Sequence, residues 1–596
     1  MTADPHSYSD LSQGRIKHIV LHINVDFQAR ILRVRADYVL EKPSGGLATP
    51  ATGSLFLDSR ALEITAIYSA TGPIAYEKDA RDPILGERLH LKNLDHTAGF
   101  TIELNTSPEA KALQWLEPLQ TAGGKDPFLY SQCACLHARS IFPCQDTPSV
   151  RFTYEAHLTV PENLTAVMAA AHSGVRIEGE RKIYSFNMPQ PIPSYLFALA
   201  VGDIRFKEIG PRTGIYAEPQ VLEEADWEFA ENEGKLEQAE RLFGPYRWDR
   251  YDMLIMPPSF PYGGMENPRL TFISPIAIIG DRSYTTMVSH ELAHTWTGNL
   301  VTNATWEDFW INEGWTTYAE YRISEVINGA ELNDTSFLLA IIILREDIAA
   351  FGADSERTRL KSSMKGVDPD EVFSRVPYYK GWLFLLSLER AVGREAFDAF
   401  VQRYISSYSF QSITTEAFIE FLERELPVAL EQVDIQAWVH HPGLPAELPA
   451  ITSRLYDDLK ARSAAYQGGV LPARDDTRDW HPILIQTFLN LLPGKIAPDD
   501  CRYFEALFEL GQSRDARLLF PFFRLCIRSE YKDALPGIER FVTKVGRQEY
   551  ITRLFRTMVE NEWTKGLARP MFERVRDRYH PITANVVDSL LTKAGV

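Results

Sequence analysis

The chain has 596 residues, of which 45% are hydrophobic and 24% are charged. This length predicts about three domains with well-filled cores. The formal net charge of −18 argues against a nucleic-acid-binding protein, which would need a basic surface, and its simplest consequence is solubility.

The sequence carries no recognisable signal for secretion or membrane insertion. Residues 1–14 are polar and lack the apolar centre of a signal peptide, and there is no apolar run of about 18 residues that would span a membrane. The five cysteines are few and odd in number, so a disulfide framework is not expected. We therefore expect a cytoplasmic protein with no membrane span and no nucleic-acid partner.

Residues 1–203 are predicted to form an N-terminal β domain. The segments 19–27, 30–40 and 151–160 alternate between polar and apolar residues, the last two most cleanly. This period of two is typical of half-buried antiparallel strands joined by turns. We expect an all-β saddle or sandwich.

Residues 204–440 are predicted to form a mainly helical domain beside a small sheet. The acidic segment 221–243 is predicted to be helical, and 251–256 is predicted to be a short strand that ends at two prolines. Further helices are expected at 283–300, 309–326 and 381–392.

The proline-rich segment 441–457 is predicted to be a linker, followed by a C-terminal helical domain at 458–596. From Trp480 onward, helical segments alternate with short breaks such as Pro493-Gly494. Serial antiparallel helices of this length suggest an α-helical solenoid, although no repeat is sharp enough to prove it. The fold class is therefore multidomain α+β.

The strongest functional signal is His290-Glu291-Leu292-Ala293-His294, followed after eighteen residues by Glu313. Two histidines four apart on a helix project from one face, so His290 and His294 can bind one metal ion. Glu313 can supply a third ligand from the next helix. Three protein ligands and one open position are typical of a catalytic zinc site. The alternative, a chance match on a solvated helix, is disfavoured by Glu313 and by the glycine-rich stretch upstream.

Glu291 is offset around the same helix, so it can reach a zinc-bound water rather than the zinc. Zinc lowers the pKa of such a water toward neutrality. Glu291 would accept its proton and later pass it to the leaving amine. Asn312 and Glu320 are candidates for orienting the histidines, with ordinary polar positions as the alternative.

Residues 262–267 read Tyr-Gly-Gly-Met-Glu-Asn. Paired glycines allow a backbone to pass close to a ligand, and the following Glu266 could bind a cation. Taken alone, this stretch is more simply a Gly-Gly turn with a surface glutamate.

Together, the Gly-Gly-Met-Glu-Asn stretch and the His-Glu-x-x-His motif with Glu313 resemble the M1 family of zinc aminopeptidases, the gluzincins. Matches at 131–133, 143–150, 368–370, 376–378 and 412–415 resemble most closely the leukotriene A4 hydrolase and aminopeptidase B-like members. The resemblance implies a β saddle, a thermolysin-like catalytic domain and an armadillo-like helical domain, with the active site in a cleft between them.

The resemblance also implies the activity and the roles of individual residues. It implies a monomer with one Zn²⁺ per chain that hydrolyses the N-terminal peptide bond of short peptides. Glu266 would hold the free α-amino group, and Tyr378 rather than Tyr379 would donate a hydrogen bond to the oxyanion. The further substrate-binding residues would be Gln132, Tyr262, Gly263, Gly264, Met265, Asn267, Asp370 and Lys565.

Three departures from the leukotriene A4 hydrolase pattern leave the zinc residues intact. They are Ala134, Phe373 and Thr564-Lys565-Gly566, where one lysine replaces an Arg-x-Lys pair that binds a substrate carboxylate. These changes weaken, without excluding, a second function as a fatty-acid epoxide hydrolase, since Asp370 is retained. A helical scaffold with an inactive peptidase domain is disfavoured because every expected site residue is present.

Overall fold

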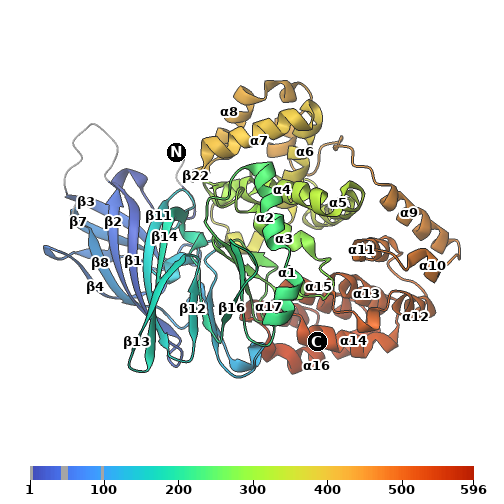
Figure 1. The fold of residues 1–596 in the computed structure, drawn as a ribbon, viewed down its shortest axis with the longest axis horizontal. Coiled ribbons are helices and arrows are strands. Elements are labelled where there is room, and N and C mark those ends of the chain that lie inside the picture. Colours follow the sequence, from blue (N-terminus) through green and yellow to red (C-terminus); the bar gives the residue numbers. More distant parts are fainter. Residues whose placement is uncertain (1–3, 42–51, 96–98, 373) are drawn as a thin grey trace.

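The computed structural model describes residues 4–41, 52–95, 99–372 and 374–596, so Phe373 lies outside the described residues. Strands from the first third of the chain, a central helical part and a C-terminal set of helices follow one another in Figure 1. This arrangement confirms the predicted three-part fold class. In the described part of the chain, no helix is both long enough and apolar enough to cross a membrane.

The N-terminal part is built from β-sheets. The largest has the strand order β13 (Ala171–Glu178), β14 (Arg181–Pro193), β11 (Arg151–Pro161), β1 (Arg15–Asp26), β2 (Ile31–Glu41), β8 (Phe100–Asn105), β4 (Glu63–Ser69) and β5 (Gly72–Pro73). A second has the order β3 (Thr52–Ser59), β7 (Glu87–Asp95) and β6 (Tyr76–Lys78). A third has the order β12 (Thr165–Met168), β15 (Leu199–Gly202), β10 (Phe128–Ser131) and β9 (Leu113–Leu116).

The alternating sequence pattern decides which face of the large sheet is buried. In β1, Ile19, Leu21 and Ile23 are buried while the residues between them are half-buried or exposed, as the period of two predicts. The expectation of antiparallel pairing was only partly right. β1 pairs antiparallel with β2 but parallel with β11. A parallel neighbour cannot be joined by a tight hairpin, and the intervening strands provide the long connection that it needs.

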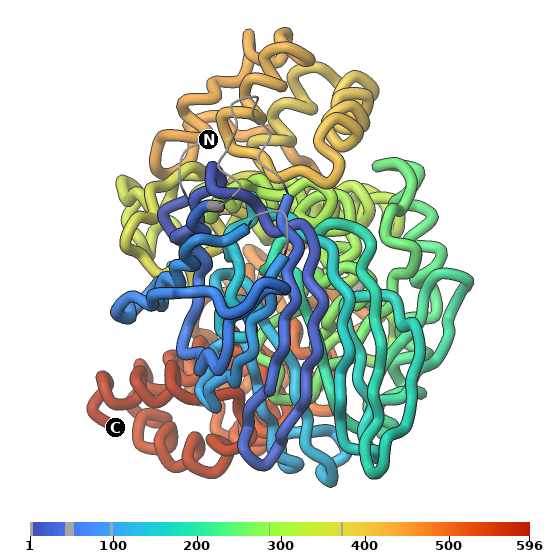
Figure 2. Tube along the Cα trace, turned by 90° about the vertical axis from the view of Figure 1, so that its left-hand side faces the viewer, coloured from blue at the N-terminus to red at the C-terminus, as the bar shows by residue number. Residues whose placement is uncertain are grey.

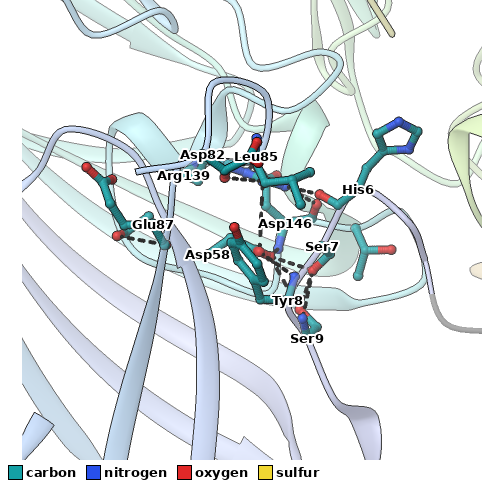
Figure 3. Close-up of polar contacts among 12 residues, drawn as sticks. His6, Ser7, Tyr8, Ser9, Asp58, Asp82, Leu85, Glu87, Arg139 and Asp146 are labelled. Carbon is teal, nitrogen blue, oxygen red and sulfur yellow. Dashed lines mark hydrogen bonds and ion pairs between the residues drawn. The ribbon is translucent and has the colours of Figure 1, made fainter. Parts of the chain in front are cut away.

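A buried ion cluster fixes the segment that follows β10 (Figure 3). The fully buried guanidinium of Arg139 lies 2.8 Å from Asp146 and 3.8 Å from Asp58, and also donates to the carbonyl of His6. The backbone N–H of Tyr8 donates to Asp58 at 2.7 Å, which ties the N-terminal segment to the cluster. Removing one partner of a buried ion pair costs about 3–5 kcal/mol, so this cluster holds the 137–146 segment firmly.

The central part has a small sheet with the order β16 (Arg205–Glu208), β17 (Thr213–Ala217), β18 (Tyr251–Ile255), β20 (Leu270–Ile273) and β19 (Gly264–Met265). Its helices are α1 (Leu222–Phe229), α2 (Asn232–Phe243), α3 (Thr285–Ala293), α4 (Trp310–Asn328), α5 (Ala330–Phe351), α6 (Gly381–Val392), α7 (Arg394–Tyr408) and α8 (Thr415–Glu425). The single helix predicted at 221–243 is divided into α1 and α2. The helix predicted at 283–300 ends seven residues early, because the chain turns at Gly298 into the short strand β21 (Val301–Asn303).

The C-terminal part consists of serial helices, as predicted. They are α9 (Arg454–Gln467), α10 (Arg474–Thr477), α11 (Pro482–Leu491), α12 (Pro498–Leu507), α13 (Ala516–Arg528), α14 (Leu535–Lys544), α15 (Gln548–Val559), α16 (Glu562–Val575) and α17 (Pro581–Lys593). Proline at the first helical position begins α11, α12 and α17, where its missing N–H costs nothing. Figure 2 shows the last helices, in red, below the central helices and beside the sheets.

The predicted domain boundaries stay predictions. α9 begins at Arg454, so the last residues of the segment 441–457, predicted to be a linker, are helical.

Candidate active site

Two helices of the central part bring the predicted zinc ligands together. His290 and Glu291 lie on α3, His294 directly follows its last residue, and Glu313 lies in the first turn of α4. The Nε2 atoms of His290 and His294 are 3.2 Å apart. They lie 3.3 Å and 3.6 Å, respectively, from the same oxygen of Glu313. The three residues predicted from their spacing therefore meet at one point.

This donor set fits a zinc ion. Ligand atoms about 2.0–2.1 Å from a common tetrahedral centre would lie about 3.3 Å from one another, close to the observed spacings. In the described part of the chain, the buried Oε2 atom of Glu313 has no hydrogen-bond partner, so a positive charge between these atoms would satisfy it. Two imidazoles and one carboxylate are the ligand types that zinc uses in catalytic sites.

Hydrogen bonds to the outer ring nitrogens leave both Nε2 atoms free to bind metal. His290 Nδ1 lies 2.9 Å from the carboxylate of Glu320, as the spacing along α4 suggested. His294 Nδ1 lies 3.1 Å from the hydroxyl of Thr316, whose own hydrogen is donated to the carbonyl of Thr297. Thr316 can therefore only accept from His294, which places the proton on Nδ1.

Thr316 was not expected from the sequence, whereas Asn312 was a candidate for orienting the histidines. Thr316 lies three residues after Glu313, one turn along the same helix, and this spacing could have indicated it. Asn312 is fully buried, and its amide donates to the Tyr195 hydroxyl at 3.3 Å. Asn312 thus ties α4 to the N-terminal part, and it also lies close to His294.

The charges around the histidines attract a cation. Although burial acts in the opposite direction, the nearby carboxylates of Glu313 and Glu320 raise the pKa of His290 well above its usual value. Burial lowers the pKa of His294 to about 3 and raises the pKa of Glu291 to about 8. Buried carboxyl groups with too little positive charge around them hold their protons, and a cation bound at this point would favour their ionised forms.

Glycines without room for a side chain set the positions of these groups. A Cβ at Gly298 (φ +114°) would lie 2.5 Å from Asn312 Oδ1 and 2.6 Å from His294 Nδ1. A Cβ at Gly314, directly after Glu313, would lie 2.8 Å from the Cα of Gly381. The backbones of α4 and α6 therefore touch at Gly314 and Gly381.

That contact places Tyr378 over the ring of His290. Tyr378 lies on a single-turn π-helix, η9 (Val376–Lys380), which leads directly into α6 at Gly381. Its ring is roughly parallel to that of His290, with 5.9 Å between the centroids. Burial and the nearby Glu313 carboxylate raise the pKa of Tyr378 well above its usual value, so its hydroxyl keeps its proton.

The glycine-rich segment forms the other wall of the site. Gly264 and Met265 form the short strand β19, and a Cβ at Gly264 would lie 2.5 Å from the carboxyl carbon of Glu291. Glu266, which directly follows, is 8% exposed, and burial raises the pKa of its carboxyl group. One ligand atom each from Glu266, Glu291 and His294 lie within 4.8 Å of one another. Glu266 is therefore buried beside Glu291 and His294, unlike the surface glutamate of a simple turn.

The remaining predicted substrate residues lie around this wall. The amide of Gln132 approaches the sulfur of Met265 at 3.2 Å. Asp370 lies 2.7 Å from His137 Nε2, and burial together with the Asp370 charge raises the pKa of Tyr262. Asn267 is buried with an unpartnered amide nitrogen.

Among the described residues, no polar contact links Lys565 to this site. Lys565 lies in α16, and in the described part of the chain no hydrogen bond or ion pair joins its side chain to another predicted site residue. The cation next to the glycine-rich segment is instead Arg547, whose guanidinium would lie 3.5 Å from a Cβ at Gly263. No sequence signal distinguishes Arg547 from other arginines, because its position depends on how the C-terminal helices dock.

Comparisons with known proteins agree with this geometry. Residues 227–438 match the peptidase family M1 domain, and residues 19–196 match its N-terminal domain. The chain is 37% identical to leukotriene A-4 hydrolase from Xenopus laevis and 36% identical to leucine aminopeptidase 2 from Chaetomium globosum, each over 98% of both chains. The structure of native yeast LTA4 hydrolase superposes with a TM-score of 0.89 at 30% identity, covering 99% of this chain and 97% of that one.

The fold, the zinc-ligand geometry and these matches define the class: the chain belongs to peptidase family M1 and is a zinc-dependent aminopeptidase. Within that family it is of the leukotriene A4 hydrolase type, because residues 480–591 match the leukotriene A4 hydrolase C-terminal domain.

Proposed function

We propose that this enzyme removes single residues from the N-terminus of short peptides, and that Glu266 binds the free α-amino group. The observation that carries the proposal is the proximity of Glu266 to Glu291 and His294, within 4.8 Å. A carboxylate at this distance from the reacting groups fixes the N-terminal amine so that only the first peptide bond reaches them. An internal peptide bond would leave Glu266 buried without a cation.

The chain's own residues supply the remaining steps. When bound to His290, His294 and Glu313, zinc supplies Lewis-acid polarisation and lowers the pKa of water. Glu291 accepts the proton of the attacking water and returns it to the leaving amine. Tyr378 donates a hydrogen bond to the oxygen that gains negative charge, since its hydroxyl stays protonated.

Further features of the proposal concern the substrate-lining residues, the location and the assembly. Gln132, Tyr262, Asn267 and Asp370 are proposed to line the substrate, because they surround Glu266 and Met265 or lie next to them in the chain. A cytoplasmic location and a monomeric state are proposed from the sequence, together with the boundaries at 203, 440 and 457.

The experiment compares peptides that differ only in the N-terminal amine. The enzyme is expected to cleave Ala-Ala-Ala amide and to leave its N-acetylated form uncut. Glu266→Gln should lower kcat/KM for the free peptide at least 100-fold, because it removes the charge that orients the amine. Cleavage of both peptides at similar rates would refute the exopeptidase assignment.

A second candidate activity is hydrolysis of a fatty-acid epoxide. It is favoured by the match to leukotriene A-4 hydrolase from Xenopus laevis and by the presence of Asp370 beside the site. Incubation with the lipid epoxide, followed by product analysis, tests whether the enzyme hydrolyses the epoxide. An enzymatically formed diol supports the activity, whereas products identical to those of the enzyme-free reaction exclude it.

A further inference from the structure

Glu549 joins three arginines at the contact between the central and C-terminal parts. Its carboxylate lies 2.9 Å from Arg547 Nη2, forms an ion pair with Arg375 and lies 3.7 Å from Arg553. Although burial acts in the opposite direction, Arg375 and Arg547 hold the pKa of Glu549 at about 2. Glu549 is therefore ionised at any pH at which the enzyme works.

Two of these arginines, Arg547 and Arg375, lie beside elements of the active site. The guanidinium of Arg547 lies against Gly263, and Gly264, the next residue, has Glu291 against it. Arg547 and the carboxylate of Glu291 therefore contact adjacent residues of one segment, whose Cα atoms are about 3.8 Å apart. Arg375 directly precedes η9, the π-helix that carries Tyr378.

The segment that holds Arg547 is firmly docked. The backbone N–H of Gln548 donates to the carbonyl of Pro261 at 2.9 Å. A Cβ at Gly546 would collide with the carbonyl of Pro258. Arg547 therefore has little freedom to move away from Gly263, and its charge is a fixed feature of this wall.

A short peptide brings its own carboxylate into this region. A tripeptide extends about 7 Å beyond its first peptide bond, which is the distance of two extended residues. With its amine at Glu266 and its first peptide bond at Glu291, its C-terminal carboxylate can reach the neighbourhood of Arg547. There the carboxylate meets the guanidinium of Arg547, which is already paired with the carboxylate of Glu549.

We propose that Glu549 is a specificity-determining residue that competes with the C-terminal carboxylate of the substrate for Arg547. The inference rests on the proposed function. A tripeptide acid must displace Glu549 from Arg547 to bind there, whereas a peptide with a neutral C-terminus does not. The wild-type enzyme therefore gains little from a free C-terminal carboxylate and accepts amidated peptides about as well.

The test measures kcat/KM for Ala-Ala-Ala and for Ala-Ala-Ala amide, and takes their ratio. Glu549→Gln frees Arg547 and is expected to raise the acid-to-amide ratio about tenfold. Glu346→Gln is the matched control, since Glu346 lies 3.5 Å from Arg553 at the outer side of the same arginine cluster and does not contact Arg547. The acid-to-amide ratio of Glu346→Gln should equal that of the wild type. An unchanged ratio in Glu549→Gln would overturn the proposal.

A second variant tests the proposal without changing Glu549. Because Glu549 already occupies Arg547 in the wild type, Arg547→Gln should change the acid-to-amide ratio less than threefold. A tenfold fall would show that Arg547 binds the substrate carboxylate despite Glu549, and would overturn the inference. Failure of the proposed function would look different, because neither tripeptide would be cleaved by any variant.

Discussion

Replacement of Gly314 by alanine tests how the contact between α4 and α6 shapes the site. The added Cβ would lie 2.8 Å from Gly381 Cα and 3.0 Å from the Pro377 carbonyl, both backbone atoms that cannot rotate away. The two backbones must separate by about 0.6 Å to reach an ordinary contact of 3.4 Å. Overpacking of this kind costs about 1–3 kcal/mol, and the better helix propensity of alanine returns about 1 kcal/mol.

The larger effect is expected on catalysis, because the separation moves Tyr378 relative to Glu313. Displacements of about 1 Å can cost about 100-fold in rate, so we expect kcat to fall about tenfold with zinc still bound. The assay combines kcat on an alanyl p-nitroanilide with zinc content. Gly234→Ala in α2 is the control, since a Cβ there meets nothing within 4 Å. Full activity in Gly314→Ala, or an equal loss in Gly234→Ala, would refute the reasoning.

Three further outcomes follow from individual contacts. Thr316→Val removes the acceptor of the His294 N–H and should weaken zinc binding about 10- to 100-fold in a chelator competition; unchanged affinity would contradict the assigned hydrogen bond. Tyr378→Phe should lower kcat about 100-fold or more while Tyr379→Phe stays within a few-fold, and equal losses would contradict the assignment. The pKa of Glu549 is about 2 in the folded protein and about 4.3 in the unfolded chain. Its negative charge therefore stabilises the fold above pH ~4.3, and this stabilisation is lost as the pH falls toward 2. The difference in urea midpoint between wild type and Glu549→Gln should shrink between pH 6 and pH 3, and a constant difference would contradict it.

Local periodicity made part of the site predictable. The spacing of His290 and His294 on one helix, and of Glu313 and Glu320 on the next, requires only helical geometry, and all four side chains meet in the structure. The helix predicted at 381–392 has the same bounds as α6, because a glycine marks each end of an apolar segment.

Features that depend on packing between distant segments were not predictable. The parallel pairing of β1 with β11 joins residues more than 100 positions apart, and nothing in either strand specifies its direction. The resemblance implied a substrate-binding role for Lys565, whereas the contact of Arg547 with Gly263 arises only from the docking of the C-terminal helices. Thr316 becomes a partner of His294 only through the way α3 packs on α4.

The most direct test of the central claim is the activity and zinc content of Glu291→Gln. Glu291 does not belong to the ligand set of His290, His294 and Glu313, so the variant should retain about one zinc per chain. Its turnover of alanyl p-nitroanilide should fall at least 100-fold, because the proton acceptor is gone. Undiminished turnover with zinc in place would contradict the account.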